Sequence, residues 1–186
     1  PGQKPRILDV GGVAPDRGGK EFWLPAEEVS SGQVLAVDPI FCNVPNFIQG
    51  SGSHLPCKDK YFDIVAAMDV LEHIPESERK GFLQELNRVS CDMVLLSCPF
   101  ADESIQKAED ELFALIKTLH ELPHVQLLEH KNYGLPDKDM VTDMLKHHCS
   151  TLISFSYGSL DTWLFIQSLK YCFYQKHNAA EIQSKI

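Results

Sequence analysis

Short apolar runs alternate with amphipathic stretches along this chain. The apolar runs predict strands at residues 6–10, 33–37, 46–49, 62–68, 93–97 and 151–156. Most of these runs are too continuously apolar to leave one face in water, which is typical of central strands in a parallel sheet. The pattern therefore predicts an α/β fold rather than an all-α or all-β one.

The stretches between these runs have helical periodicity. A helix is predicted over residues 76–89, and another after Asp102, ending before Pro123. Two more follow Asp137 and Asp161, and we expect their apolar stripes to face the core. These stripes are Met140, Val141, Met144, Leu145 and His148, then Phe165, Ile166, Leu169, Cys172 and Phe173.

Alternation of strands and helices predicts right-handed crossovers. We expect a Rossmann-like, doubly wound, mostly parallel sheet of about six to seven strands, with helices on both faces. With 186 residues, 44% of them hydrophobic, the chain fits a single domain spanning residues 1–186, whose tail at 177–186 frays.

Charge and hydropathy exclude several kinds of partner. The net charge of -9 argues against nucleic acid, because phosphate binding requires clustered Lys and Arg. No apolar run approaches the roughly 20 residues that span a bilayer, so no membrane insertion is expected. The first five residues also lack the apolar core of a signal peptide.

The six cysteines are scattered and form no Cys-x-x-Cys pair. Free thiols beside apolar residues pack as small hydrophobes, which favours a reducing, cytoplasmic setting. His147, His148 and Cys149 are adjacent, but neighbours on a helix point in different directions, so we expect no metal site.

Polar residues and glycines follow three of the predicted strands. Asp9, Gly11 and Gly12 end the first, Asp38 ends the second, and Asp69 follows the strand at 62–68. The carboxyl ends of parallel strands lie along one edge of a sheet, where open α/β sheets bind ligands. These residues are therefore candidates for one binding site.

The segments ILDVGG, VLAVDP and YFDIVAAMDVLEHIP resemble the class I S-adenosylmethionine-dependent methyltransferases. The resemblance implies that S-adenosylmethionine is the cofactor and S-adenosylhomocysteine the product. It places Asp9, Gly11 and Gly12 at the methionine part of the cofactor, where a following helix would offer amides to its carboxylate. It places Asp38 at the ribose hydroxyls and Asp69 at the methionine portion.

The same resemblance assigns the adenine surroundings. Pro39 and Ile40 would contact the ring, and the loop from Gly50 to Pro56 would reach its amino group. Ser51 stands where the family often has Asp, followed by Gly52, and a hydroxyl can still make one hydrogen bond to adenine.

The sequence departs from the family in three places. Val13, Ala14 and Pro15 replace further glycines of the first motif. Only five residues precede Arg6, so we expect the helices that usually come before the first strand to be missing. The usual closing hairpin is also not evident after residue 156.

Methyl transfer by the family is an in-line displacement from a sulfonium, for which alignment matters more than acid-base chemistry. His73 is a candidate base if the acceptor must lose a proton. Alternatively, Glu72 and His73 cap or brace the next helix. Asp63, at a strand start, is expected to be structural.

The acceptor side is less defined. Pro99 and Phe100 match positions near the family's acceptor pocket. Glu129-His130 followed by Gly134-Leu135-Pro136 resembles a subgroup found alongside glycan-modifying enzymes, and would form a polar loop that acts as a substrate lid. The alternative is a loop fixed by a buried Glu–His pair. Trp23 and Trp163 could stack on a ring or belong to the core.

We expect a small-molecule or glycan acceptor, with the oligomeric state open. One rival function is a nicotinamide dehydrogenase, but Gly11 to Asp16 lacks the required Gly-x-Gly-x-x-Gly. Another is a methyltransferase-like binding or scaffold domain without catalysis, which the altered glycine loop, Ser51 and the missing front helices favour.

Overall fold

The computed structural model describes residues 4–15, 22–121, 123–147 and 150–173. The chain divides into two compact units, Pro1–Cys98 and Pro99–Ile186. In the described residues, the first unit contains the strands of a sheet and the second contains four helices. That residues 1–186 form a single domain stays a prediction, and the tail at 177–186 lies outside the described residues.

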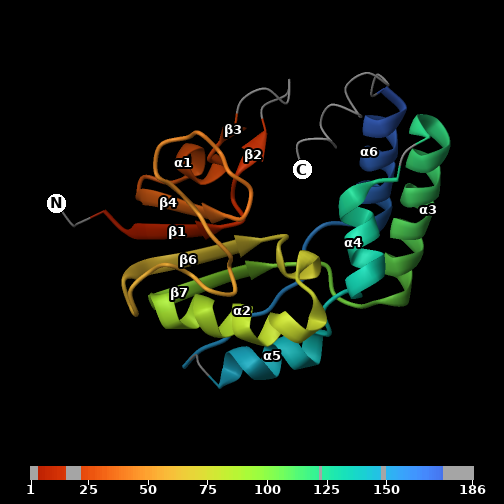
Figure 1. Ribbon diagram of the computed structural model, residues 1–186. Helices are drawn as coiled ribbons and strands as arrows, with labels where there is room; N and C mark the ends of the chain where they lie inside the picture. The colour runs from red at the N-terminus through yellow and green to blue at the C-terminus, as the bar shows by residue number, and fades with distance from the viewer. Residues whose placement is uncertain (1–3, 16–21, 122, 148–149, 174–186) are drawn as a thin grey trace. The chain divides into compact units, whose positions relative to one another are not determined.

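A five-stranded parallel sheet forms the centre of the first unit (Figure 1). Its strands are β1 (Arg6–Val10), β4 (Gln33–Asp38), β5 (Phe47–Gln49), β6 (Phe62–Met68) and β7 (Ser90–Ser97). They lie in the order β5-β4-β1-β6-β7. The chain starts in the middle and moves first to one side and then to the other, as in a doubly wound fold. The predicted fold class is confirmed.

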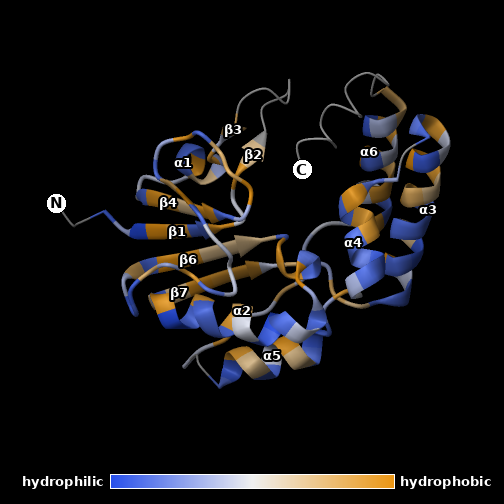
Figure 2. Cartoon of the chain, viewed as in Figure 1, coloured by the Kyte–Doolittle hydropathy of each residue, from blue (hydrophilic) through white to orange (hydrophobic). Residues whose placement is uncertain are grey.

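The apolar runs of these strands form the core of the sheet. Leu8, Val37 and Val65 on the three central strands are fully buried. Figure 2 shows β6 and β7 as largely hydrophobic and α2 (Glu76–Val89) as largely hydrophilic. The apolar stripe of α2, which includes the fully buried Phe82, covers part of the sheet, since this helix packs against β6 and β7. The short α1 (Pro25–Val29) packs against β4.

The parallel sheet has five strands, slightly fewer than predicted, because residues 151–156 do not form one. Ile153 and Phe155 in this segment are 80% and 77% exposed. A strand needs a neighbour for its backbone N–H and C=O groups, and the described part of the second unit holds no strand to pair with.

The described residues between β1 and β4 include a small antiparallel hairpin, β2 (Ala14–Pro15) with β3 (Phe22–Trp23). The helix implied by the family resemblance is not found directly after β1 in these residues. Val13, Ala14 and Pro15 carry no side-chain oxygen that could cap a helix start, which agrees with this difference.

At the opposite end of β1, Arg6 and Asp63 bind each other across the start of β6. The Asp63 carboxylate accepts hydrogen bonds from the Arg6 backbone N–H at 2.7 Å and from Nη2 at 3.0 Å. These bonds hold the pKa of Asp63 well below its usual range. Asp63 is structural, as predicted.

In the second unit, the helices are α3 (Glu103–His120), α4 (Val125–Tyr133), α5 (Lys138–Lys146) and α6 (Leu160–Phe173). Two predicted caps are confirmed. Asp102 accepts a hydrogen bond from the Ser104 backbone N–H at 2.8 Å, and Asp137 accepts one from the Met140 N–H at 2.7 Å. On α5, Val141 and Leu145 are buried as predicted, whereas His148 lies outside the described residues.

The prediction for α6 is wrong in two respects. Asp161 lies inside the first turn, and the Ser159 hydroxyl accepts a hydrogen bond from the Thr162 N–H at 3.4 Å. The predicted stripe is largely exposed, with Phe165 at 63% and Phe173 at 81%. The residues of α6 that pack against the cluster of Leu112, Ile116 and Leu127 are Trp163, Leu164 and Tyr171.

This difference has a physical cause. Apolar side chains occur all round α6, so periodicity alone does not identify its buried face. Among the described residues, no helix is long and apolar enough to cross a bilayer.

Candidate functional site

The carboxyl ends of β1, β4 and β6 bring three acidic residues to one edge of the sheet. Val10 lies opposite Val37 in the register of β1 and β4, so Gly11 follows one strand where Asp38 ends the other. The Gly11 N–H donates to the Val37 carbonyl at 2.8 Å. Asp69 follows β6, the neighbour of β1 on its other side. The predicted convergence of these strand ends is present.

Both glycines after β1 occupy positions that exclude a side chain. Gly11 has a φ of 76°, and a Cβ there would lie 2.6 Å from a methyl group of Val70. A Cβ on Gly12 would collide with the carboxyl group of Asp9, which packs directly over this residue. Gly11 therefore allows the Val70 side chain to approach the backbone closely, and Gly12 allows the same for the Asp9 carboxyl group.

The carboxyl group of Asp9 is buried, with 6% of the residue exposed, and makes no hydrogen bond to the described residues. Burial raises its pKa to about 6, and the nearby charge of Asp38 raises it further. Such a carboxyl is a functional-site candidate, because structural carboxylates in proteins are normally hydrogen-bonded or paired.

Asp38 is half-buried at the end of β4. Its Oδ1 accepts a hydrogen bond from the Ile40 N–H at 2.8 Å, while Oδ2 has no partner among the described residues. Burial raises the pKa of Asp38, and the hydrogen bond from Ile40 opposes that shift. The Pro39 carbonyl accepts a hydrogen bond from Gln49 Nε2 at 3.0 Å, which ties this turn to the end of β5. One carboxylate oxygen of Asp38 is thus available to a ligand.

The loop after β5 contains Ser51 and Gly52. The Ser51 hydroxyl accepts a hydrogen bond from the Ser53 N–H at 3.2 Å, and the His54 N–H donates to the Ser51 carbonyl at 3.1 Å. A Cβ on Gly52 would collide with the ring of Phe82, so this glycine permits close packing of the loop on α2. Contact of Gly52 with a cofactor stays a prediction.

Sequence reasoning missed Ser53 in the same loop. The residue is 8% exposed, and its hydroxyl oxygen has no hydrogen-bond partner among the described residues. Buried hydroxyl groups are normally satisfied, so Ser53 is an additional candidate for ligand contact. Ser53 lies within the segment from Gly50 to Pro56, which the family resemblance places near adenine. That position was the signal that could have identified it.

Asp69 adopts the left-handed conformation, with a φ of 55°. Its N–H donates to the Ser97 carbonyl at 2.8 Å, and the Ser97 hydroxyl donates to Asp69 Oδ1 at the same distance. These two bonds from the end of β7 support a backbone conformation that is uncommon outside glycine. Ser97 was not singled out from the sequence, because a serine ending a strand gives no distinctive pattern.

Glu72 and His73 lie on a short 3-10 helix, Leu71–His73, before α2. Glu72 is 2% exposed and close enough to the buried Arg79 for its charge to raise the Arg79 pKa, although burial lowers that pKa more strongly. The Arg79 Nε donates to the Ile74 carbonyl at 3.0 Å. These contacts favour the bracing interpretation for Glu72, while the role of His73 as a base stays a prediction.

Comparison with models of known protein families gives one match. Residues 24–98 match the family model described as a methyltransferase domain. This segment is therefore similar to methyltransferase domains. The match includes β4, β6, α2 and β7 but begins after the glycines that follow β1. The altered glycine loop therefore lies outside the matched residues.

Solved structures agree with this fold. A candidate methyltransferase from Bacillus halodurans C-125 is 19% identical with a TM-score of 0.52, over 97% of this chain and 75% of that one. YcgJ from Bacillus subtilis is 17% identical with a TM-score of 0.52, over 98% and 76%. PH0226 from Pyrococcus horikoshii OT3 is 16% identical with a TM-score of 0.56, over 84% and 80%. Comparison with curated proteins gave no match.

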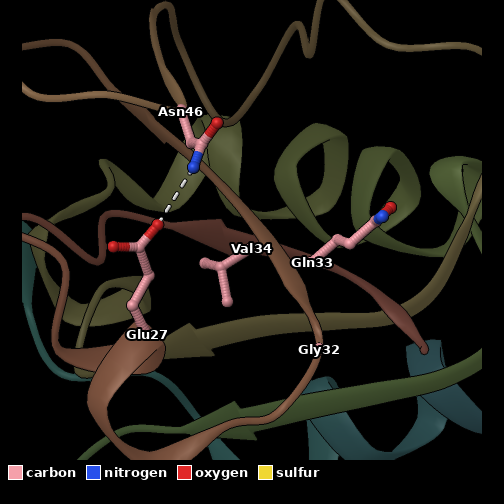
Figure 3. Close-up of a pocket in the computed structure, with 5 residues that line it drawn as sticks. All are labelled: Glu27, Gly32, Gln33, Val34 and Asn46. Atoms are coloured by element: carbon pink, nitrogen blue, oxygen red, sulfur yellow. Dashed lines mark hydrogen bonds between the residues drawn. The ribbon is translucent and has the colours of Figure 1, made fainter.

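The cavity in Figure 3 lies away from the candidate cofactor site at the carboxyl edge of the sheet. Its lining includes Gln33 at the start of β4, Asn46 just before β5, and Glu27 of α1, whose carboxylate accepts a hydrogen bond from Asn46 at 3.1 Å. The amino ends of these parallel strands are opposite the edge that carries Asp38. This cavity is therefore not part of the candidate cofactor site.

In the second unit, the predicted polar loop at Glu129-His130 is wrong, because both residues lie in α4. His124 starts this helix, since its Nδ1 accepts a hydrogen bond from the Leu127 N–H at 3.3 Å. His130 Nδ1 is 2.9 Å from Glu109 Oε1 on α3, and both side chains are largely buried. A buried Glu–His pair exists, but its acid is Glu109.

The two tryptophans differ in exposure. Trp163 packs against the apolar cluster between α3 and α4, which supports its assignment to the core. Trp23 on β3 is 42% exposed. The proposals that Trp23 stacks on a ring, and that Gly134 to Pro136 belongs to a substrate lid, stay predictions.

Proposed function

We propose that this protein binds S-adenosylmethionine at the carboxyl edge of its sheet and transfers the methyl group to a small-molecule or glycan acceptor. The family of residues 24–98 and the doubly wound fold support this function. The acceptor class rests on the resemblance of Glu129 to Pro136 to methyltransferases found alongside glycan-modifying enzymes. The net charge of -9 argues against a nucleic-acid acceptor.

The observation that carries the proposal is the pair of carboxyl groups at the ends of β1 and β4. Asp9 and Asp38 are close enough for one charge to raise the pKa of the other, and no described cation neutralises either. The free Oδ2 of Asp38 suits two ribose hydroxyls, and the Asp9 carboxylate suits an ammonium group. The adenosyl cofactor contains both kinds of donor, so the residues present fit it.

When bound, S-adenosylmethionine supplies a methyl group on a sulfonium, which is already activated toward a nucleophile. The protein's contribution is then to hold and orient, which can lower a barrier by up to roughly 7 to 11 kcal/mol. Asp38 would orient the ribose, Asp9 and Asp69 the methionine part, and Ser51 the adenine. His73 would accept a proton only where the acceptor has to lose one.

A specific observation also favours a second candidate, a binding or scaffold domain that does not transfer methyl groups. The described residues show a hairpin rather than a helix after β1, and the Asp9 carboxyl packs over Gly12. Both features differ from the glycine-rich opening expected for an active enzyme. Such a domain could bind the cofactor without transferring its methyl group.

Cofactor binding is tested by thermal or denaturant unfolding with S-adenosylhomocysteine. At one hundred times its dissociation constant, a ligand that binds only the folded state stabilises it by about 2.7 kcal/mol. Nicotinamide dinucleotides serve as the control and should cause no shift. Absence of a shift with S-adenosylhomocysteine would contradict the proposed function.

Asp38→Ala tests the site itself. Loss of a charged hydrogen-bond acceptor should weaken S-adenosylhomocysteine binding by about 10-fold to 100-fold, with little change in the far-ultraviolet circular dichroism. An unchanged affinity would remove Asp38 from the site. Radiolabelled methyl transfer into separated small-molecule and glycan fractions of cell extract then distinguishes an enzyme from a scaffold that binds without transfer.

A further inference from the structure

The side chain of Arg88, on the last turn of α2, uses all five of its N–H donors. Nε donates to Glu85 Oε1 at 2.7 Å, and Nη2 donates to Glu85 Oε2 at 2.8 Å. Nη2 also donates to the Leu55 carbonyl at 3.0 Å, and Nη1 donates to the Cys57 carbonyl at 2.8 Å and to Asp59 Oδ1 at 2.6 Å. A guanidinium has five such donors, so this one is fully engaged.

Glu85 completes the arrangement. Its Oε2 accepts a hydrogen bond from the Leu55 N–H at 2.8 Å, so both backbone groups of Leu55 are bound by one pair of side chains. The hydrogen bond and charge of Arg88 lower the pKa of Glu85, and the same bond raises that of Arg88. We call these two residues, with their bonds to the loop, the Glu85–Arg88 clamp.

The clamp fixes the distal part of the loop that follows β5. Gly52 packs on Phe82, one turn before Glu85 on α2, and the clamp binds the loop again at Leu55. Ser51 precedes the first attachment, and its carbonyl accepts a hydrogen bond from the His54 N–H, which lies between the two attachments. The loop is therefore attached to α2 at two points on either side of Ser53 and His54.

We propose that the Glu85–Arg88 clamp is a positioning device for nucleobase recognition, which holds the Ser51 hydroxyl where it meets the exocyclic amino group of adenine. The proposal rests on the cofactor site described under the proposed function. Glu85 and Arg88 themselves touch no ligand and act through the loop. Protein hydrogen bonds weaken steeply beyond about 3.5 Å, so a loop released from α2 would lose this contact while other cofactor contacts remain.

The test compares two ligands by isothermal titration. The analogue of S-adenosylhomocysteine that carries hydrogen in place of the exocyclic amino group offers the Ser51 hydroxyl neither a donor nor an acceptor at that position, so the ratio of the two affinities measures recognition of the amino group. The unmodified protein should prefer the adenosyl ligand by about fivefold, the value of one hydrogen bond. Arg88→Gln should reduce this preference to near one, and Glu85→Gln should reduce it in part.

Arg6→Gln is the matched control. It removes an ion pair with Asp63 in the same unit, at the opposite end of the sheet, and should leave the preference for adenine unchanged. If Arg88 had a merely structural role, Arg88→Gln would lower stability without changing the ratio of affinities, which is the result expected of Arg6→Gln. If Arg88→Gln fails to fold, Glu85→Gln and Arg88→Lys carry the same measurement.

The outcomes separate the two proposals. Binding of neither ligand to the unmodified protein overturns the proposed function and the clamp together. Binding of both ligands with equal affinity, or an unchanged preference in folded Arg88→Gln or Glu85→Gln, overturns the clamp alone. A preference that falls in the clamp variants and persists in Arg6→Gln supports it.

Discussion

The carboxyl group of Asp9 lies in an environment unlike that of an ordinary surface aspartate. It is buried beside Asp38, no cation among the described residues neutralises it, and its pKa is raised to about 6. An aspartate in an unfolded chain has a pKa of about 3.9. The folded protein therefore binds this proton more tightly than the unfolded chain does.

The sign of the pH dependence follows from this difference. Between about pH 4 and pH 6 the folded state holds more protons, so the free energy of unfolding falls as the pH rises through this range. The loss should be on the order of 2 kcal/mol. Asp9→Asn, which cannot ionise, should not show it.

Urea unfolding of both proteins from pH 4 to pH 7 measures this effect as the difference between the two curves. Other carboxylates, such as Asp63, contribute equally to both proteins and cancel in the comparison. If the free energies of unfolding of Asp9→Asn and the unmodified protein changed in parallel with pH, ionisation of Asp9 would not destabilise the folded protein.

At the same scale, the sequence identified residues that have a distinctive context and missed those that do not. Asp9, Asp38 and Asp69 were recognisable because each lies at the end of an apolar strand or directly after it. Ser97 was not, because its importance comes from a cross-strand bond to Asp69 that only the pairing of β6 with β7 creates.

At the scale of elements, strands were predicted more accurately than helix faces. β1 and β6 have the predicted bounds, because a buried parallel strand is apolar on both sides and its limits are set by polar neighbours. α4 was missed because His124 is not among the common cap residues, although its ring accepts the capping hydrogen bond. The orientation of α6 depends on its partners, which the sequence pattern does not specify.

Two aromatic residues on α6 provide a matched test of its orientation. Trp163 packs against the cluster on α3 and α4, whereas Phe165, two positions later, is 63% exposed. Trp163→Ala should lower the free energy of unfolding by about 2 to 3 kcal/mol, since large core truncations typically remove several kcal/mol and this ring is only partly buried. Phe165→Ala should change it by less than about 0.5 kcal/mol.

Denaturant midpoints, with slopes checked for equality, measure both variants. Equal losses, or a larger loss for Phe165→Ala, would mean that the predicted stripe rather than the observed one faces the core. The comparison needs no ligand and is independent of the proposed function.

At the scale of the whole molecule, the proposed cofactor contacts come from segments far apart in the sequence. They lie at or just after the carboxyl ends of β1, β4, β5 and β6, and the order of strands brings these ends to one edge. Hydrogen exchange with S-adenosylhomocysteine should therefore slow at residues 9–12, 38–40, 51–53 and 69–70 together. Protection confined to one segment, or centred on the cavity at Glu27 and Asn46, would contradict a site at the carboxyl edge.

The hairpin that follows β1 has a consequence for ligand selectivity. A helix beginning at that point would direct its partial positive charge and free amides toward an anion. The described residues form two short antiparallel strands instead. The carboxylate in the methionine part of S-adenosylmethionine should then add little to the affinity of this protein for the cofactor. Decarboxylated S-adenosylhomocysteine, which keeps its amine, should consequently compete almost as well as the intact compound, making truncated donors useful probes of this protein.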